Sequence, residues 1–309
     1  MQSPLAARQG IAPSRVWLPA GPWLIMGEFL VQRFNHVAEA DLRLRLERGD
    51  IVQSNGQAVR FHTPYKANQW LWYYRQVDHE VVVPFELSIL YEDEQLVAVD
   101  KPHFMATTPG GQHLLYTALV QLRKRLNNMA ITPLHRLDRD TAGVLLFCKQ
   151  PALRGAYQQL FYKQEVEKDY EAIAPALDAA RFPLHYKSRL EAPEGQLLMQ
   201  EVDGEPNSDT YISVLAQWQH TTLGKLAWYR LQPLTGRKHQ LRMHLLALGA
   251  PIVNDRYYPQ GQPLADPSDF TAPLQLLARS IAFIDPVTHE YKQFSSQRRL
   301  AYLPEHLKH

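Results

Sequence analysis

Hydrophobic and polar positions follow two different patterns along the chain, with no internal repeat. Short apolar runs between polar turns predict strands at 87–91, 96–99, 144–148, 169–174, 186–191, 209–217 and 224–232. Helices are predicted at 114–126, 152–162 and 238–248, the last with Thr235 as its N-cap and Gly249 at its end. Because strands outnumber helices and do not alternate with them regularly, the pattern favours an α+β fold over a doubly wound sheet.

The first 83 residues have a pattern of their own. Residues 1–26 are rich in proline and small residues and predict an extended arm. Residues 38–48 predict a short charged helix that ends at Gly49, although alternating leucines leave its period ambiguous between helix and strand. The Asn55-Gly56 pair predicts a tight turn. We therefore expect a small module at 27–83, followed by a larger domain at 84–309.

Composition limits the class of protein. The chain has 309 residues, of which 45% are hydrophobic and 21% charged, so a disordered or low-complexity protein is excluded. A single cysteine, Cys148, excludes an internal disulfide framework and a multi-cysteine zinc site. The sequence shows neither a secretory signal nor an apolar stretch of the ~20 residues that a membrane helix needs. We expect a soluble, cytoplasmic protein without a membrane partner.

The net charge of +2 hides strong local patterning. Residues 225–256 hold six basic side chains and one acidic one. Residues 121–140 hold five basic side chains and two acidic ones. In contrast, 78–100 and 191–209 hold seven and six acidic side chains with no Lys or Arg. Such asymmetry indicates either a basic face for a polyanion or solvated charges that form no single face. Charge alone leaves both interpretations open.

The segment 133–143, Pro-Leu-His-Arg-Leu-Asp-Arg-Asp-Thr-Ala-Gly, is the most informative for chemistry. Two carboxylates and two guanidiniums lie within five residues, immediately before an apolar strand. Nearby arginines favour the charged form of a carboxylate, so Asp138 is a candidate nucleophile or base rather than an acid. The alternative is a structural turn held by salt bridges.

This segment resembles the "HRLDxxTSG" signature of the RluA-type pseudouridine synthases. Further blocks resemble that family in the same order, over residues 87–290: Lys101-Pro102, 168–173, 234–244 with 249–255, and 277–286. Ala142 replaces the usual Ser and Asn254 a Gly, which are small changes in turns. His103 and Phe104 replace small residues at the cleft rim, which puts the substrate preference in doubt.

The resemblance implies a mixed, largely antiparallel sheet crossed by a cleft. Residues 49–56 are also similar to the "G-x-V-x-V-N-G" hairpin of S4-type RNA-binding modules, although the usual helix entry is absent. The module at 27–83 is thus expected to be S4-like. The alternative is an unrelated N-terminal cap on the next domain.

The resemblance further implies conversion of uridine to pseudouridine in RNA, without a redox cofactor, nucleotide cofactor or metal. It assigns catalysis to Asp138, Tyr170 and Arg242. Asp138 either attacks C1′ or takes a proton from C2′, Tyr170 stacks on the uracil, and Arg242 pairs with Asp138. RNA contacts are expected from Arg136, Arg139, Arg237, Lys238, His239 and Lys124, and apolar walls of the base pocket from Leu137 and Ile252. The partner is ribosomal or transfer RNA, with ribosomal RNA favoured, and a monomer is expected.

Other functions fit less well. His239 and His244 are five residues apart and would point to different sides of a helix, unlike a zinc-binding pair. The arginine inside Asp138-Arg139-Asp140 disfavours a divalent ion, and no glycine-rich phosphate loop supports a kinase. A non-catalytic RNA-binding or ribosome-assembly protein on the same scaffold is the remaining alternative. The presence of all three expected catalytic side chains argues against it.

Overall fold

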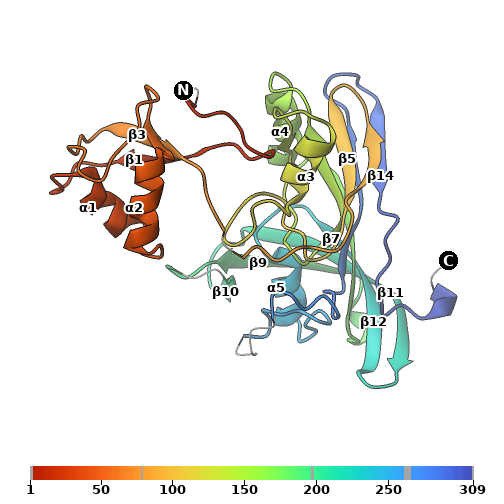
Figure 1. The fold of residues 1–309 in the computed structure, drawn as a ribbon. Helices are drawn as coiled ribbons and strands as arrows, with labels where there is room; N and C mark the ends of the chain where they lie inside the picture. The colour runs from red at the N-terminus through yellow and green to blue at the C-terminus, as the bar shows by residue number, and fades with distance from the viewer. Residues whose placement is uncertain (1–2, 78, 196–197, 261–265, 308–309) are drawn as a thin grey trace. The chain divides into compact units, whose positions relative to one another are not determined.

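A computed structural model divides the chain into two units, residues 1–80 and 81–309 (Figure 1). The structure describes residues 3–77, 79–195, 198–260 and 266–307. Within these ranges, no helix is long and apolar enough to cross a membrane.

The first unit packs two helices against a three-stranded sheet. Its helices are α1 (Met26–Arg33) and α2 (Glu39–Arg48), and its sheet has the antiparallel order β1 (Ser14–Leu18), β3 (Gln69–Tyr73), β2 (Ile51–Gln53). In α2, Leu42 and Leu46 are buried while Leu44 is exposed, so the ambiguous leucine pattern is helical. Gly49 ends α2 in the left-handed conformation, as predicted. The predicted arm is extended where it forms β1.

The second unit is built on one mixed sheet of eleven strands. Its order is β10-β9-β11-β12-β8-β13-β7-β5-β4, with β14 beside β13 and β6 beside β7. The strands are β4 (Ser88–Glu92), β5 (Leu96–Lys101), β6 (Thr132–Pro133), β7 (Ala142–Cys148), β8 (Glu167–Pro175), β9 (Leu184–Glu191), β10 (Gln200–Val202), β11 (Ser208–His220), β12 (Gly224–Pro233), β13 (Leu276–Ile284) and β14 (Tyr291–Ser295). Among the pairings of these strands in the described residues, only β13–β7 is parallel, which confirms the expected α+β, largely antiparallel fold.

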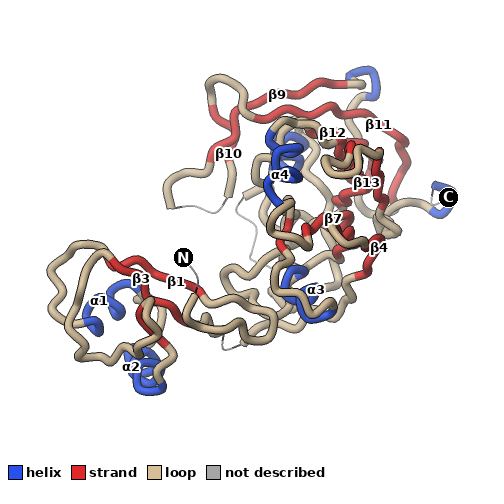
Figure 2. The backbone as a smooth tube through the Cα atoms, turned by 90° about the horizontal axis from the view of Figure 1, so that it is seen from above, coloured by secondary structure: helices blue, strands red, loops and turns tan. Residues whose placement is uncertain are grey.

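Helices cover both faces of the sheet where β5 and β7 lie side by side. Alternate residues of these strands pack against α3 (Ala118–Arg125) on one face and α4 (Arg154–Tyr162) on the other. The third helix, α5 (Gln240–Ala247), packs on β8, β11 and β12. Short 3₁₀ turns occupy Ala179–Arg181 and Glu305–Leu307. Figure 2 shows α3 and α4 beside the strands of this unit.

The start of α5 differs from its prediction. The N-cap is His239, with a φ of 56°, and Thr235 is therefore not the cap. The Thr235 hydroxyl instead donates to the Gln240 side chain and accepts the backbone N–H of Asp209, 2.9 Å away. Because Thr235 is bonded to β11, it does not start the helix, which begins only after a turn at Lys238 and His239.

Gly143 determines how closely β7 and β13 approach. It has a φ of 115°, and a Cβ atom there would lie 2.2 Å from the carbonyl oxygen of Ala278 on β13. Only glycine allows this contact. The parallel pairing therefore holds the turn that precedes β7, which carries Asp138, beside the central strands of the sheet.

Candidate active site

A cleft of about 740 Å³ lies in the second unit. Its walls come from residues 133–138 before β7, from β8, from the loop between β12 and α5, and from α4, α5 and the start of β13. Asp138, Tyr170 and Arg242, which the sequence motifs group as catalytic, all line it. Asp138 and Arg242, which are 104 residues apart in the chain, thus meet at one cleft.

Arg242 connects two carboxylates at the base of this cleft. Its Nε and Nη2 donate to Asp255 at 2.7 and 2.6 Å, and both side chains are 1% exposed. Its Nη1 lies 3.4 Å from Oδ2 of Asp138, whose side chain is 30% exposed. Burial opposes the charge of Arg242, but hydrogen bonds to Asp255 and the charge of Asp255 outweigh it and raise the pKa of the guanidinium. A permanent cation is therefore fixed beside the accessible carboxylate of Asp138.

His239 approaches the same carboxylate oxygen of Asp138 as Arg242 does. Its Nε2 is 3.9 Å from the carboxylate, and its Nδ1 lies 2.8 Å from the hydroxyl of Tyr258. Burial lowers the pKa of His239 to about 4, although Asp138 opposes the shift. The ring is thus neutral at pH 7, and it stacks at 6.1 Å on Tyr257. The His239 ring therefore offers the cleft a flat, polar surface, and it carries no positive charge that could bind a phosphate.

Tyr170 comes from β8 and forms part of the cleft wall. Its ring packs against two of the core clusters, which hold it in place. Burial and the charge of Asp138 raise the pKa of its hydroxyl, so the group keeps its proton at neutral pH. Leu137 lines the cleft as expected, whereas Ile252 lies in the core beneath α5 and is not among the lining residues. Leu241 and Leu276 provide apolar wall instead.

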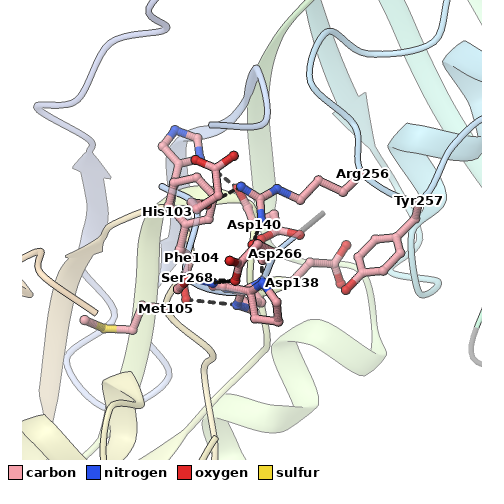
Figure 3. A network of polar contacts seen from close by, with 12 residues as sticks. His103, Phe104, Met105, Asp138, Asp140, Arg256, Tyr257, Asp266 and Ser268 are labelled. Atoms are coloured by element: carbon pink, nitrogen blue, oxygen red, sulfur yellow. Dashed lines mark hydrogen bonds and ion pairs between the residues drawn. The ribbon is translucent and has the colours of Figure 1, made fainter. Parts of the chain in front are cut away.

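The backbone on both sides of Asp138 is held by residues 101–107. Figure 3 shows His103, Phe104 and Met105 of this segment near Asp138 and Asp140. The Thr107 hydroxyl donates to the carbonyl of Leu137 at 2.8 Å and accepts its N–H at 3.2 Å. The buried Lys101 ammonium donates to the carbonyl of Arg139 at 3.2 Å, and burial lowers its pKa to about 7. His103 Nδ1 lies 2.7 Å from the carbonyl of Asp140. We call residues 101–107 the clamp segment.

The expected RNA-binding cations lie in different surroundings. Arg136 and Arg237 are exposed and line the cleft. Lys238 and Lys124 are exposed but lie outside the cleft lining. Arg139 is turned away from the cleft, because its guanidinium donates to the carbonyls of Phe104 at 3.2 Å and Pro267 at 2.9 Å. It joins the clamp segment to the 266–272 loop.

Sequence reasoning did not single out several side chains of the site. Asp255 and His135 lie within motifs that resemble the family, and this location is the signal that could have identified them from the sequence. His135 stacks at 5.1 Å on Phe161 in the cleft wall and accepts the N–H of Leu146, and burial lowers its pKa to about 3. Lys168, whose pKa burial lowers to about 8, donates to the carbonyl of Thr235. No sequence pattern indicated that Thr107 would contact the turn that carries Asp138.

No metal centre is evident in the described ranges, where no three His, Cys, Asp or Glu side chains gather in a suitable group. His244 is fully buried, with Nδ1 3.0 Å from the Thr210 hydroxyl and Nε2 2.9 Å from that of Ser208. It braces α5 against β11 and is not among the residues that line the cleft.

Comparisons with known proteins identify the family of the chain. The sequence profile described as RNA pseudouridylate synthase matches residues 95–247. An RNA pseudouridine synthase of Synechocystis is 33% identical over 252 residues, which is 79% of this chain and 84% of the relative. The dual-specificity RNA pseudouridine synthase RluA of Pasteurella multocida is 30% identical, over 68% of this chain and 92% of the relative. The chain belongs to the RluA-type RNA pseudouridine synthases.

A solved structure supports the fold of the synthase. Human RNA pseudouridylate synthase domain containing 1 superposes with a TM-score of 0.56 at 23% identity, over 69% of this chain and 84% of that one. The shared architecture is therefore detectable where little sequence identity remains.

Two departures from the family pattern have structural consequences in this synthase. Phe104 and Asn254 have φ values of 66° and 62°, a region that costs a non-glycine residue energy. Phe104 is 1% exposed and packs on Phe270 at 5.3 Å, with the guanidinium of Arg256 4.9 Å above its ring. These contacts stabilise the unfavourable backbone at Phe104, and they connect the clamp segment with the 266–272 loop.

Replacing Asp255 by asparagine should destabilise the synthase strongly. Asp255→Asn leaves the Arg242 guanidinium buried without its anionic partner, which typically costs about 3–5 kcal/mol. We expect the Tm of the second unit to fall by about 10 °C in a thermal melt followed by circular dichroism. Glu191→Gln removes one partner of the exposed Arg189–Glu191 pair and should change stability by less than about 1 kcal/mol. Equal Tm values for the two variants would contradict the role given to the buried pair.

Proposed function

We propose that the synthase isomerises uridines in structured RNA with Asp138 as the catalytic carboxylate. The observation that supports this best is the position of Asp138, which is reachable from the cleft and lies 3.4 Å from the buried cation of Arg242. Within the described cleft lining, it is the sole carboxylate. The reaction needs an anionic oxygen next to the sugar, and this side chain is the candidate for it.

The chemistry determines what the other residues do. The C1′–N1 bond breaks, the uracil turns, and a C1′–C5 bond forms, while the proton lost from C5 is balanced by one gained at N1. Because these atoms lie inside a base stack, the uridine has to leave the stack before it reaches Asp138. We propose that Tyr170 stacks on the extruded uracil and that Leu137 supports its apolar edge. The protonated hydroxyl of Tyr170 fits a hydrogen-bonding role beside this stacking.

The route through Asp138 has two forms, attack on C1′ or removal of a proton from C2′. In both, Arg242 acts on the carboxylate rather than on the RNA, since it is almost completely buried. We propose that the exposed Arg136 and Arg237 at the cleft contact the phosphates and the vacated position in the RNA. Lys124 and Lys238 would then contribute phosphate contacts farther from the cleft.

Asp138→Asn should abolish pseudouridine formation while leaving RNA binding intact. The amide preserves the shape of the side chain but removes the anion, so turnover should fall by more than about a thousand-fold. Release of tritium from RNA labelled at C5 of uridine measures turnover, and filter binding measures affinity. Asp203→Asn, at an exposed position away from the cleft, is the matched control and should keep wild-type activity. An active Asp138→Asn enzyme would rule out the proposed carboxylate.

Thr107→Val should slow catalysis without weakening RNA binding. We propose Thr107 as a positioning residue, because its hydroxyl makes two hydrogen bonds to the residue before Asp138. Valine keeps the volume and removes both bonds, so kcat should fall by about 10- to 100-fold while KM stays within about twofold. Thr107→Ser should restore kcat, and Thr108→Val should leave it unchanged. A parallel loss of kcat and folded protein would mean that Thr107 only stabilises the fold.

We further propose ribosomal RNA as the substrate, because a separate N-terminal unit suits recognition of a large structured RNA. Chemical mapping of pseudouridines in cells with and without the gene tests this directly. At least one ribosomal RNA position should lose its pseudouridine when the gene is deleted and regain it with the wild-type gene but not with Asp138→Asn. Loss confined to transfer RNA would overturn the ribosomal assignment and keep the enzymatic one.

A further inference from the structure

The outer face of the sheet in the first unit carries a concentration of aromatic side chains. Val16, Leu18 and Leu71 point into the core of this unit, so the alternate residues of β1 and β3 point to the opposite face. Those alternate residues are Arg15 and Trp17 on β1 and Trp70 and Trp72 on β3. Three of the six tryptophans of the chain thus lie on one face of two five-residue strands.

These side chains stack on one another and on arginines. Trp17 contacts Trp70 edge-on at 5.1 Å. The guanidinium of Arg15 lies over Trp70 at 4.3 Å and near Trp72 at 5.7 Å. One position beyond β3 on the same face, Tyr74 is covered by the guanidinium of Arg8 at 3.8 Å, and its hydroxyl donates to the carbonyl of Ala6. We call Arg8, Arg15, Trp17, Trp70, Trp72 and Tyr74 the aromatic ladder.

The outermost members of the aromatic ladder are accessible. Trp17 is 41% exposed, and Arg8 and Arg15 are exposed as well. Neither guanidinium forms an ion pair with a carboxylate within the described part of the chain. Arg15 is also the only charged residue of β1, β2 and β3. Trp70 and Tyr74 are half-buried and Trp72 is buried, so the accessible part of this face consists mainly of the Trp17 ring and the two guanidiniums. It carries positive charge, and β1, β2 and β3 contain no carboxylate.

Single-stranded RNA matches this chemistry better than an apolar partner. Bases stack on exposed aromatic rings and on guanidinium planes, while the same guanidiniums contact phosphates. An apolar protein surface would instead require a wide apolar area, and here the exposed ring of Trp17 shares the face with the exposed guanidiniums of Arg8 and Arg15. We propose that the aromatic ladder binds a single-stranded segment of RNA by base stacking. This inference rests on the proposed function for the identity of the RNA as substrate, and it adds a second contact surface outside the cleft.

Binding of a labelled decauridylate to the full-length protein tests the aromatic ladder. Fluorescence anisotropy should show that Arg15→Ala/Trp17→Ala weakens binding by about 10-fold or more, since stacking contributes about 1–3 kcal/mol per base. The slope of log K against log salt should shrink by about 0.7 with the loss of one phosphate contact to a single strand. Both side chains lie on the surface, so the Tm of the variant should equal that of the wild type.

The matched control is Leu44→Ala/Arg48→Ala, which removes one exposed apolar and one exposed basic side chain from α2. It should bind decauridylate as the wild type does. An equal loss in both variants, or a loss in the α2 variant alone, would overturn the proposal.

A second measurement is independent of affinity at the cleft. Decauridylate containing 4-thiouridine, cross-linked by light to the Asp138→Asn protein, should attach to a peptide of β1 or β3. Cross-links confined to the second unit would overturn the aromatic ladder. Because this readout uses no turnover, it separates failure of the ladder from failure of Asp138 as the catalytic group, which the tritium-release assay tests.

Discussion

The buried ion pair between Arg242 and Asp255 is the interaction on which the cleft depends. Two charges without water are expensive unless every donor and acceptor is satisfied. Here the pair is bidentate, and Asp255 also accepts the backbone N–H groups of Tyr257 and Tyr258 at 2.9 and 3.1 Å. The remaining nitrogen of Arg242 is thereby directed at Asp138. A structural pair thus orients the accessible carboxylate, and a substitution at Asp255 acts on stability and on the site together.

The backbone around Asp138 is held in place as well, so Arg242 alone does not position the side chain. The clamp segment bonds to the backbone on both sides of Asp138, from Thr107 to Leu137 and from Lys101 to Arg139. The close approach of β7 and β13 at Gly143 determines where the turn that carries Asp138 joins β7. The turn is therefore held by contacts to its backbone, and the Asp138 side chain remains 30% exposed.

Local pattern predicted seven of the eleven strands of the second unit and its three helices, whereas β6, β10, β13 and β14 were not predicted. The apolar runs of β5 and β7 reflect helices on both faces, and the exposure of Leu44 resolves the ambiguous leucines of α2. Motif resemblance alone grouped Asp138, Tyr170 and Arg242, although they lie far apart in the chain. The position of Thr107 was not predictable, since a hydroxyl bonded across 30 residues leaves no trace in spacing. The cap at His239 was missed because tertiary contacts of Thr235 outweighed its local preference.

Charge is the property that sequence averages describe least well in this protein. Arg139 and Arg136 are three residues apart in one motif, yet the first bonds to carbonyl groups and the second is exposed at the cleft. A basic segment therefore does not translate into a count of phosphate contacts. The same reasoning applies to Arg8 and Arg15 of the first unit, whose guanidiniums lie on aromatic rings. What a cation can bind is decided by its neighbours, and the net charge of +2 contains no information about them.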